Sequence, residues 1–165
     1  MKQELILRTP ISEDGIAVFD LIARCPPLDP NSMYCNLLQC SHFADTSVAA
    51  LNAEDLVGFI SGYIIPKSPQ TLFIWQLAVD ERMRGQGLAA KMLHFLLHQS
   101  SSRDVSFVET TITEDNQASW AVFEKLAKSL KAELNHFTYF DRKTHFHNRH
   151  ASEILVKIGP FKNHK

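Results

Sequence analysis

The chain contains 165 residues, of which 45% are hydrophobic and 21% are charged. The 17 Lys and Arg residues nearly balance 18 Asp and Glu residues, which gives a net charge of −1. This balance argues against a nucleic-acid or anionic-membrane partner, and the length suits a single domain over residues 1–165.

The cysteines and the N-terminal segment indicate where the protein works. The chain has three cysteines, Cys25, Cys35 and Cys40, and no CxxC pair. Because the number is odd and that spacing is missing, the pattern predicts neither a disulfide framework nor a zinc site. Residues 1–10 are too few and too charged for a signal peptide, and no apolar run is long enough to span a membrane. We therefore expect a cytoplasmic protein with reduced thiols.

Hydrophobic periodicity predicts strands and helices in the order β-α-α-β-β-β-α-β-α-β-β, which indicates an α/β fold with a mixed sheet. Ser12 is the expected N-cap of the first helix. The nearly continuous apolar run over residues 71–79 predicts a central strand that is buried on both faces. The expected strands are residues 4–9, 47–51, 56–65, 71–79, 106–112, 137–140 and 153–158, and the expected helices are about residues 12–24, 34–38, 88–100 and 116–131.

The sharpest motif, Arg-x-x-Gly-x-Gly, lies at residues 82–87, between the predicted central strand and the helix that begins at Leu88. A helix N-terminus offers unpaired N–H groups, and glycines let a diphosphate approach the backbone. Arg82 and Arg84 are placed to pair with phosphate oxygens. A Walker P-loop is excluded because no Gly-Lys-Ser/Thr follows, and a Rossmann fingerprint would need Ala90 as its third glycine. A tight turn that needs glycine only for its conformation is the alternative.

This strand, turn and helix resemble the pyrophosphate-binding element of the GCN5-related N-acetyltransferase (GNAT) family. Residues 111–116 resemble a second element of that family, in which a strand leads to an Asn that opens a helix. The resemblance covers residues 5–158 and implies a mixed central sheet of six to seven strands flanked by about four helices. It also implies acetyl-CoA as the acetyl donor, bound by Leu77, Ala78, Val79, Arg82, Arg84, Gly85, Gln86, Gly87, Leu88, Ala89, Asn116, Ser119, Trp120 and Phe123.

Phe123 departs from the family pattern. Many members carry a Tyr at this position, and its hydroxyl can protonate the departing CoA thiolate. Phe carries no such proton, so another group or water protonates the thiolate, or the thiolate leaves unaided.

Three segments resemble a narrower group within this family, the acetyltransferases that act on L-2,4-diaminobutyrate. These segments are residues 25–43, 58–63 and 71–76. The resemblance implies transfer of an acetyl group to the side-chain (N4) amine, which gives N4-acetyl-L-2,4-diaminobutyrate on the path to the compatible solute ectoine. The residues expected to bind this substrate are Asp29, Asn31, Tyr34, Asn36, Trp75, Gln76, His150 and Glu153.

Two of these positions also have a plainly structural interpretation. Asp29 offers a carboxylate to an ammonium group, but it equally suits a turn before the second helix. Trp75 lies near the end of the predicted central strand, and its side chain suits either packing in the core or contact with the substrate.

Direct attack of an amine on a thioester needs a proton acceptor and an oxyanion donor. An alkylammonium with a pKa near 10 is neutral in only about one part in a thousand at pH 7, so a base must take its proton. The backbone N–H groups near Leu77 are the expected oxyanion donors. We favour Glu153 as the base because it lies on the predicted closing strand. The full set of candidate bases is Asp29, Glu109, Glu153, His145, His147 and His150.

Other interpretations stay open on the sequence alone. The acceptor could be another small amine, such as a polyamine or an amino sugar, and a non-catalytic CoA-binding domain would also suit Phe123. The pattern His145-x-His147-x-x-His150 lacks a nearby Cys, so we expect no metal. The family resemblance further implies a homodimer.

Overall fold

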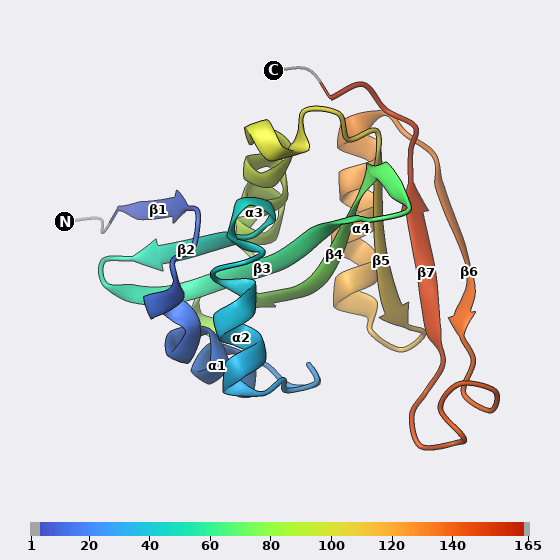
Figure 1. Ribbon diagram of the computed structural model, residues 1–165, viewed down its shortest axis with the longest axis horizontal. Coiled ribbons are helices and arrows are strands. Elements are labelled where there is room, and N and C mark those ends of the chain that lie inside the picture. The colour runs from blue at the N-terminus through green and yellow to red at the C-terminus, as the bar shows by residue number, and fades with distance from the viewer. Residues whose placement is uncertain (1–3, 164–165) are drawn as a thin grey trace.

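The computed structural model describes residues 4–163, and its elements follow the predicted order (Figure 1). The strands are β1 (Leu5–Arg8), β2 (Val48–Asn52), β3 (Asp55–Ile65), β4 (Ser68–Val79), β5 (Phe107–Thr113), β6 (Leu134–Phe140) and β7 (Glu153–Ile158). The α-helices are α1 (Gly15–Ala23), α2 (Met33–Gln39), α3 (Leu88–Leu97) and α4 (Gln117–Leu130). The prediction of six to seven strands and about four helices is confirmed.

All seven strands form one mixed sheet in the order β1-β2-β3-β4-β5-β7-β6. The β4–β5 pair is parallel, and every other pair is antiparallel. β4 therefore has three strands on each side and is central, as predicted. The single parallel pair joins two halves of the sheet, each of which is a set of antiparallel strands.

Alternate residues of β2 show how the helices cover the sheet. Val48 and Ala50 belong to the main core, which also contains the buried side chains of α3 and α4. Ala49, between them, packs in a second core with Val18 and Leu21 of α1. Successive strand residues point to opposite faces, so α3 and α4 cover one face and α1 lies on the other. Figure 1 shows this sandwich, with α1 and α2 together over the N-terminal half of the sheet.

The central strand departs from its predicted burial. Leu72 and Ile74 are each 1% exposed, whereas Trp75 is 38% exposed. The prediction that both faces of β4 are buried is therefore wrong at this position. Trp75 points away from the main core, where it meets the rings of Phe43 and Tyr63 at centroid distances of 6.1 and 5.9 Å. These neighbours cover only part of the indole.

The first helix begins later than predicted. Ser12–Asp14 form a 3-10 turn, and α1 starts at Gly15. The carboxylate of Asp14 accepts the N–H of Ile11 at 2.8 Å. Ser12 is therefore not the N-cap: Ile11 is the N-cap of the 3-10 turn, Asp14 is the N-cap of α1, and the hydroxyl of Ser12 donates to Glu13.

Within residues 4–163, none of the helices has both the length and the apolar character needed to cross a bilayer.

Candidate active site

The two central parallel strands separate halfway along their length. β4 and β5 pair only between residues 71–74 and 107–110, and at the last pair the hydroxyl of Thr110 donates to the carbonyl of Ile74 at 2.9 Å. Beyond residue 74, β4 continues to Val79, and among the strands of residues 4–163 it pairs there with β3 alone. Alternate backbone groups of residues 75–79 therefore face the gap toward β5 without a strand partner, and a bound molecule can use them.

The glycine turn follows this open segment directly. Gly85 and Gly87 have φ values of 76° and 75°, in the left-handed region that glycine adopts most easily. Apart from its two chain neighbours, a Cβ placed on either glycine would meet no atom of residues 4–163 within 4 Å, so the space beside the turn is open. Gly87 is the N-cap of α3 and provides no side-chain cap. The first N–H groups of α3 thus face a site that suits an anion.

The two predicted phosphate ligands differ in their partners. Nε and Nη2 of Arg82 both donate to the carboxylate of Asp80, at 3.1 Å. Arg84 is exposed, and its Nε donates to the carbonyl of Val79 at 3.4 Å. Among residues 4–163 no carboxylate lies within salt-bridge distance of Arg84, so its charge is available to a phosphate. The role of Arg82 as a phosphate ligand stays a prediction.

The start of α4 shows how the other predicted donor-binding residues are placed. Asn116 is the N-cap of α4, and its side-chain oxygen accepts the N–H of Ser119 at 3.3 Å. The indole of Trp120 donates to the carbonyl of Thr113 at 3.1 Å. Phe123 is 2% exposed and belongs to the main core. These contacts fix the end of β5 against α4, and direct contact with the donor stays a prediction for all four positions.

Three predicted acceptor residues from distant parts of the chain come together. Nε2 of His150 lies 3.2 Å from Oδ2 of Asp29. One oxygen of Glu153 joins them, and the three ligand atoms all lie within 4.8 Å of one another. Asp29 precedes α2, whereas Glu153 opens β7 opposite Thr113 of β5. The cluster therefore sits at the end of β5 where the sheet has opened.

Burial and neighbouring charge set the protonation of this cluster. Burial raises the pKa of Glu153 above its ordinary value, and the charge of Asp29 raises it further, while His150 lowers it. Nδ1 of His150 lies 2.6 Å from the carbonyl of Ala151, so this nitrogen carries a proton. That hydrogen bond, together with Asp29, raises the pKa of His150. The geometry favours an imidazolium that donates to Asp29 through Nε2.

Two of the residues predicted to bind the substrate, Asn31 and Gln76, are hydrogen-bonded to each other. The amide of Asn31 donates to Oε1 of Gln76 at 2.8 Å, and Nε2 of Gln76 donates to the backbone carbonyl of Asp29 at 2.9 Å. Asn31 and Gln76 thus tie the segment that carries Asp29 to the open part of β4. Their observed contacts position Asp29, and their contact with a substrate stays a prediction.

The remaining predicted acceptor residues lie in different surroundings. The side chain of Tyr34 is 70% exposed, and Trp75 is partly exposed beside Phe43 and Tyr63. Asn36 is completely buried, and its amide donates to Gln39 at 3.0 Å. Contact between Asn36 and a substrate would require α2 to move, so this burial disfavours the predicted role.

The late-loop histidines do not form the cluster that their spacing suggests. Within residues 4–163, the group of three side chains within metal-binding distance is the one formed by Asp29, His150 and Glu153. Nδ1 of His145 instead accepts the backbone N–H of Asp141 at 2.8 Å. His150 therefore contacts other residues than His145 does, although the two are close in sequence. The expectation that the chain holds no metal stays a prediction.

Sequence reasoning missed several residues that shape the site. The rings of Phe43 and Tyr63 flank Trp75, and Asp80 holds the start of the glycine turn. The aromatic residues at alternate positions of β4, Phe73 and Trp75, were a usable signal, because they share one face of a strand. Phe43 and Tyr63 lie in the segments 25–43 and 58–63 that carry the family resemblance, but their contact with Trp75 was not predicted.

Comparison with known proteins agrees with this geometry. The sequence profile of the acetyltransferase (GNAT) family matches residues 16–127. The L-2,4-diaminobutyric acid acetyltransferase of Methylotuvimicrobium alcaliphilum is 54% identical over 158 residues, which span 96% of this chain and 92% of that protein. The protein of the same name from Vibrio parahaemolyticus is 50% identical over 153 residues, which span 93% of this chain and 84% of that protein.

A solved structure is similar over nearly the whole chain. It is the diaminobutyrate acetyltransferase EctA from Paenibacillus lautus, in complex with its substrate L-2,4-diaminobutyric acid and coenzyme A. The TM-score is 0.93 at 36% sequence identity, and the match covers 99% of each chain. The open β4 strand, the glycine turn before α3 and these relatives agree: the chain belongs to the GNAT acetyltransferase family and, within it, to the L-2,4-diaminobutyric acid acetyltransferases.

Proposed function

We propose that this protein transfers the acetyl group of acetyl-CoA to the N4 amine of L-2,4-diaminobutyrate. The product is N4-acetyl-L-2,4-diaminobutyrate, and the reaction belongs to ectoine biosynthesis. One observation carries the proposal: Gln76, within the open segment of β4, donates from its side chain to the backbone carbonyl of Asp29 at 2.9 Å. The acceptor cluster is thereby fixed beside the strand that would carry the thioester. The ligands of the Paenibacillus lautus enzyme support the same pair of substrates.

The donor half of the reaction rests on backbone groups. The N–H groups at the start of α3 and the guanidinium of Arg84 would hold the diphosphate. Unpaired backbone groups of residues 77–79 would hold the pantetheine arm. One N–H near Leu77 would then face the thioester oxygen, and a single oxyanion donor of this kind is typically worth about 3 kcal/mol.

The acceptor half requires a neutral amine. Removing the proton from an alkylammonium at pH 7 costs roughly 4 kcal/mol. Glu153 would accept that proton, and its raised pKa brings it closer to the working pH of a base. The nitrogen lone pair then forms the C–N bond, and the tetrahedral intermediate collapses with loss of the C–S bond. Phe123 has no proton to give, so the CoA thiolate takes its proton elsewhere or leaves as the anion.

Selection between the two amines is a matter of position. Asp29 carries a carboxylate that is 74% exposed, so it can meet an ammonium group. If Asp29 holds the α-ammonium, the N4 amine is the one that reaches the thioester carbonyl. His150 keeps Asp29 in place and partly compensates its charge.

The proposal includes a homodimer in the cytoplasm. β6 lies at the edge of the sheet, and Phe137, Tyr139 and Phe140 on it are between 40% and 54% exposed. Exposed edge strands usually carry charges that prevent pairing, but β6 has no Lys, Arg, Asp or Glu. An antiparallel edge can pair with its own copy about a two-fold axis, which supports a second copy of this chain as the partner. The three free cysteines suit a reducing compartment.

The purified protein is expected to release CoA from acetyl-CoA when L-2,4-diaminobutyrate is present, with the acetyl group on N4. A thiol assay followed by mass spectrometry of the product measures both points. 1,4-Diaminobutane and glucosamine are the comparison amines, because they lack the carboxylate or the second amine. Acetylation of the α-amine alone, or faster turnover of a comparison amine, would contradict the proposed substrate.

Glu153→Gln is expected to lower kcat about a hundredfold or more, because it removes the base while keeping the shape. In the unchanged protein, kcat/KM should rise with pH through the raised pKa of Glu153, and the variant should lose this limb. Folding favours the protonated form of Glu153, so stability falls as pH rises through that pKa. The variant should therefore melt at a higher temperature at neutral pH.

Glu109→Gln is the matched control. Glu109 lies on β5 opposite Lys157, toward the other end of the β5–β7 pair from Glu153, and it was another candidate base. Its replacement should leave both the pH profile and kcat nearly unchanged. Equal losses in the two variants would remove the case for Glu153 as the base.

Arg84→Ala and Asp29→Asn are each expected to weaken the use of a different substrate. Loss of the Arg84 charge should raise the KM for acetyl-CoA about tenfold and leave the acceptor KM nearly constant, because a charge-assisted hydrogen bond is worth about 1.5–3 kcal/mol. Asp29→Asn should raise the KM for the acceptor and spare CoA binding. Steady-state kinetics with each substrate varied in turn make the comparison, and the reverse pattern would refute the two assignments.

Light scattering is expected to give the mass of two 18.7 kDa chains in solution. Phe137→Lys should give a monomer, because it puts a charge in the middle of β6. Ile6→Lys is the control, since Ile6 is 47% exposed on β1, the opposite edge strand. A monomeric unchanged protein, or dissociation by the Ile6 variant alone, would contradict the β6 interface.

A further inference from the structure

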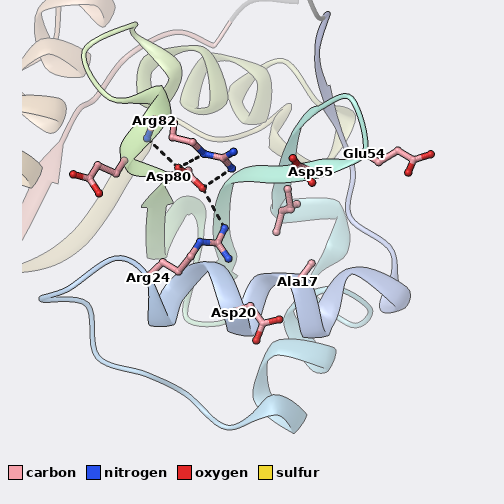
Figure 2. Close-up of a pocket in the computed structure, with 9 residues that line it drawn as sticks. Ala17, Asp20, Arg24, Glu54, Asp55, Asp80 and Arg82 are labelled. Carbon is pink, nitrogen blue, oxygen red and sulfur yellow. Dashed lines mark hydrogen bonds and ion pairs between the residues drawn. The ribbon is translucent and has the colours of Figure 1, made fainter.

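Asp80 is a buried carboxylate that connects two parts of the chain. It follows β4 directly, and its side chain is only 6% exposed. It accepts the backbone N–H of Arg82 at 3.0 Å and the guanidinium of Arg82 at 3.1 Å. Its second oxygen accepts Nη2 of Arg24 at 3.2 Å. Figure 2 shows both guanidinium groups converging on this one carboxylate, from α1 and from the glycine turn.

The contacts with Arg82 place Asp80 at the base of the glycine turn, residues 82–87, which we also call the donor turn because it is the proposed binding site of the acetyl donor. Asp80 caps a short 3-10 turn, Glu81–Met83, that leads straight into the two glycines. Its own backbone N–H donates to the carbonyl of Val57 on β3 at 2.8 Å. The start of the glycine turn is therefore anchored to the sheet through Asp80.

The contact with Arg24 places Asp80 at the base of the acceptor loop, which we define as residues 25–31. Arg24 is the last residue before this loop and the C-cap of α1. The next residue, Cys25, donates from Sγ to the carbonyl of Val79 at 3.4 Å. At its other end the loop is tied to β4 by the hydrogen bond from Asn31 to Gln76. Both ends of the acceptor loop therefore rest on the strand that leads to the donor turn.

We propose that Asp80 is a positioning residue that couples donor binding to acceptor binding, through its simultaneous bonds to Arg82 and Arg24. The proposal rests on the function proposed above. If the acceptor loop moves and withdraws Arg24, the buried carboxylate of Asp80 keeps only Arg82 as a cationic partner. Losing one of two cations at a buried charge costs free energy. The donor turn and the acceptor loop therefore adopt their binding arrangements together. By linkage, each substrate then strengthens the binding of the other.

Arg24→Gln tests this coupling, because Arg24 is the C-cap of α1 and belongs to neither the glycine turn nor the acceptor loop. We expect the variant to bind CoA about fivefold more weakly in calorimetry and to show a raised acceptor KM, with kcat less affected. Arg24→Lys, which keeps the charge, should recover part of the CoA affinity. Arg103→Gln, at an exposed arginine on another part of the surface, should leave both quantities unchanged.

A double-variant comparison separates coupling from a general loss of structure. If Asp80 transmits the effect, Arg24→Gln added to Asp80→Asn should weaken CoA binding no further than Asp80→Asn alone. Unchanged CoA affinity in Arg24→Gln, or independent and additive effects of the two changes, would overturn the proposal. Should Asp80→Asn fail to fold, the comparison of Arg24→Gln with Arg24→Lys at equal melting temperature decides the matter.

Failure of the proposed function would look different. An unchanged protein that binds CoA but does not acetylate L-2,4-diaminobutyrate would refute the substrate. The CoA affinities of the Arg24 variants would still report on the coupling in that case. Loss of all CoA binding in the unchanged protein would refute both proposals.

Discussion

The separation of β4 from β5 after Ile74 and Thr110 is the constraint on which the site depends. A strand in the middle of a sheet normally satisfies its backbone groups on both sides. Within the part of the chain that the structure describes, residues 75–79 have a strand partner on the β3 side alone, and the unpaired side opens between the two halves of the sheet. The glycine turn continues from the open strand, so the backbone that would hold a thioester and the backbone that would hold a diphosphate are consecutive.

The acceptor side differs from the donor side in how it is assembled. The donor side uses consecutive residues, whereas the charged groups of the acceptor side come from separate elements. Asp29 lies before α2, His150 lies in the loop after β6, and Glu153 begins β7. Their proximity concentrates two carboxylates around one imidazole, and burial raises the pKa of Glu153. A half-buried carboxylate of this kind is unfavourable for stability at neutral pH. That cost is consistent with a site selected for proton transfer rather than for the stability of the fold.

Hydrogen bonds between the two sides explain how they keep their relative positions. Gln76 holds the backbone of Asp29, Cys25 reaches the carbonyl of Val79, and Asp80 joins Arg24 to the donor turn. Each of these contacts ends on β4 or on the residue that follows it. The central strand thus serves as the common support of both binding regions, although only its last five residues are open to a ligand.

The sequence by itself determined the element order, the glycine turn and the family, because strand and helix periodicity and the turn at residues 82–87 are local patterns. It also singled out Asp29 for its carboxylate, Glu153 for its place on the predicted closing strand, and His150 as one of three histidines in the late loop. Only the tertiary structure decided that these three meet, that Arg82 is held by Asp80, and that Asn36 is buried. The meeting of the three depends on contacts between distant residues, such as Asp29 and His150, which are 121 positions apart. Asp80 lies only two residues before Arg82, but the sequence places Glu81 beside Arg82 as well and does not show which carboxylate the arginine takes. Local sequence does not encode the partner of a charged side chain, because that partner is chosen by how the sheet and its loops fold together.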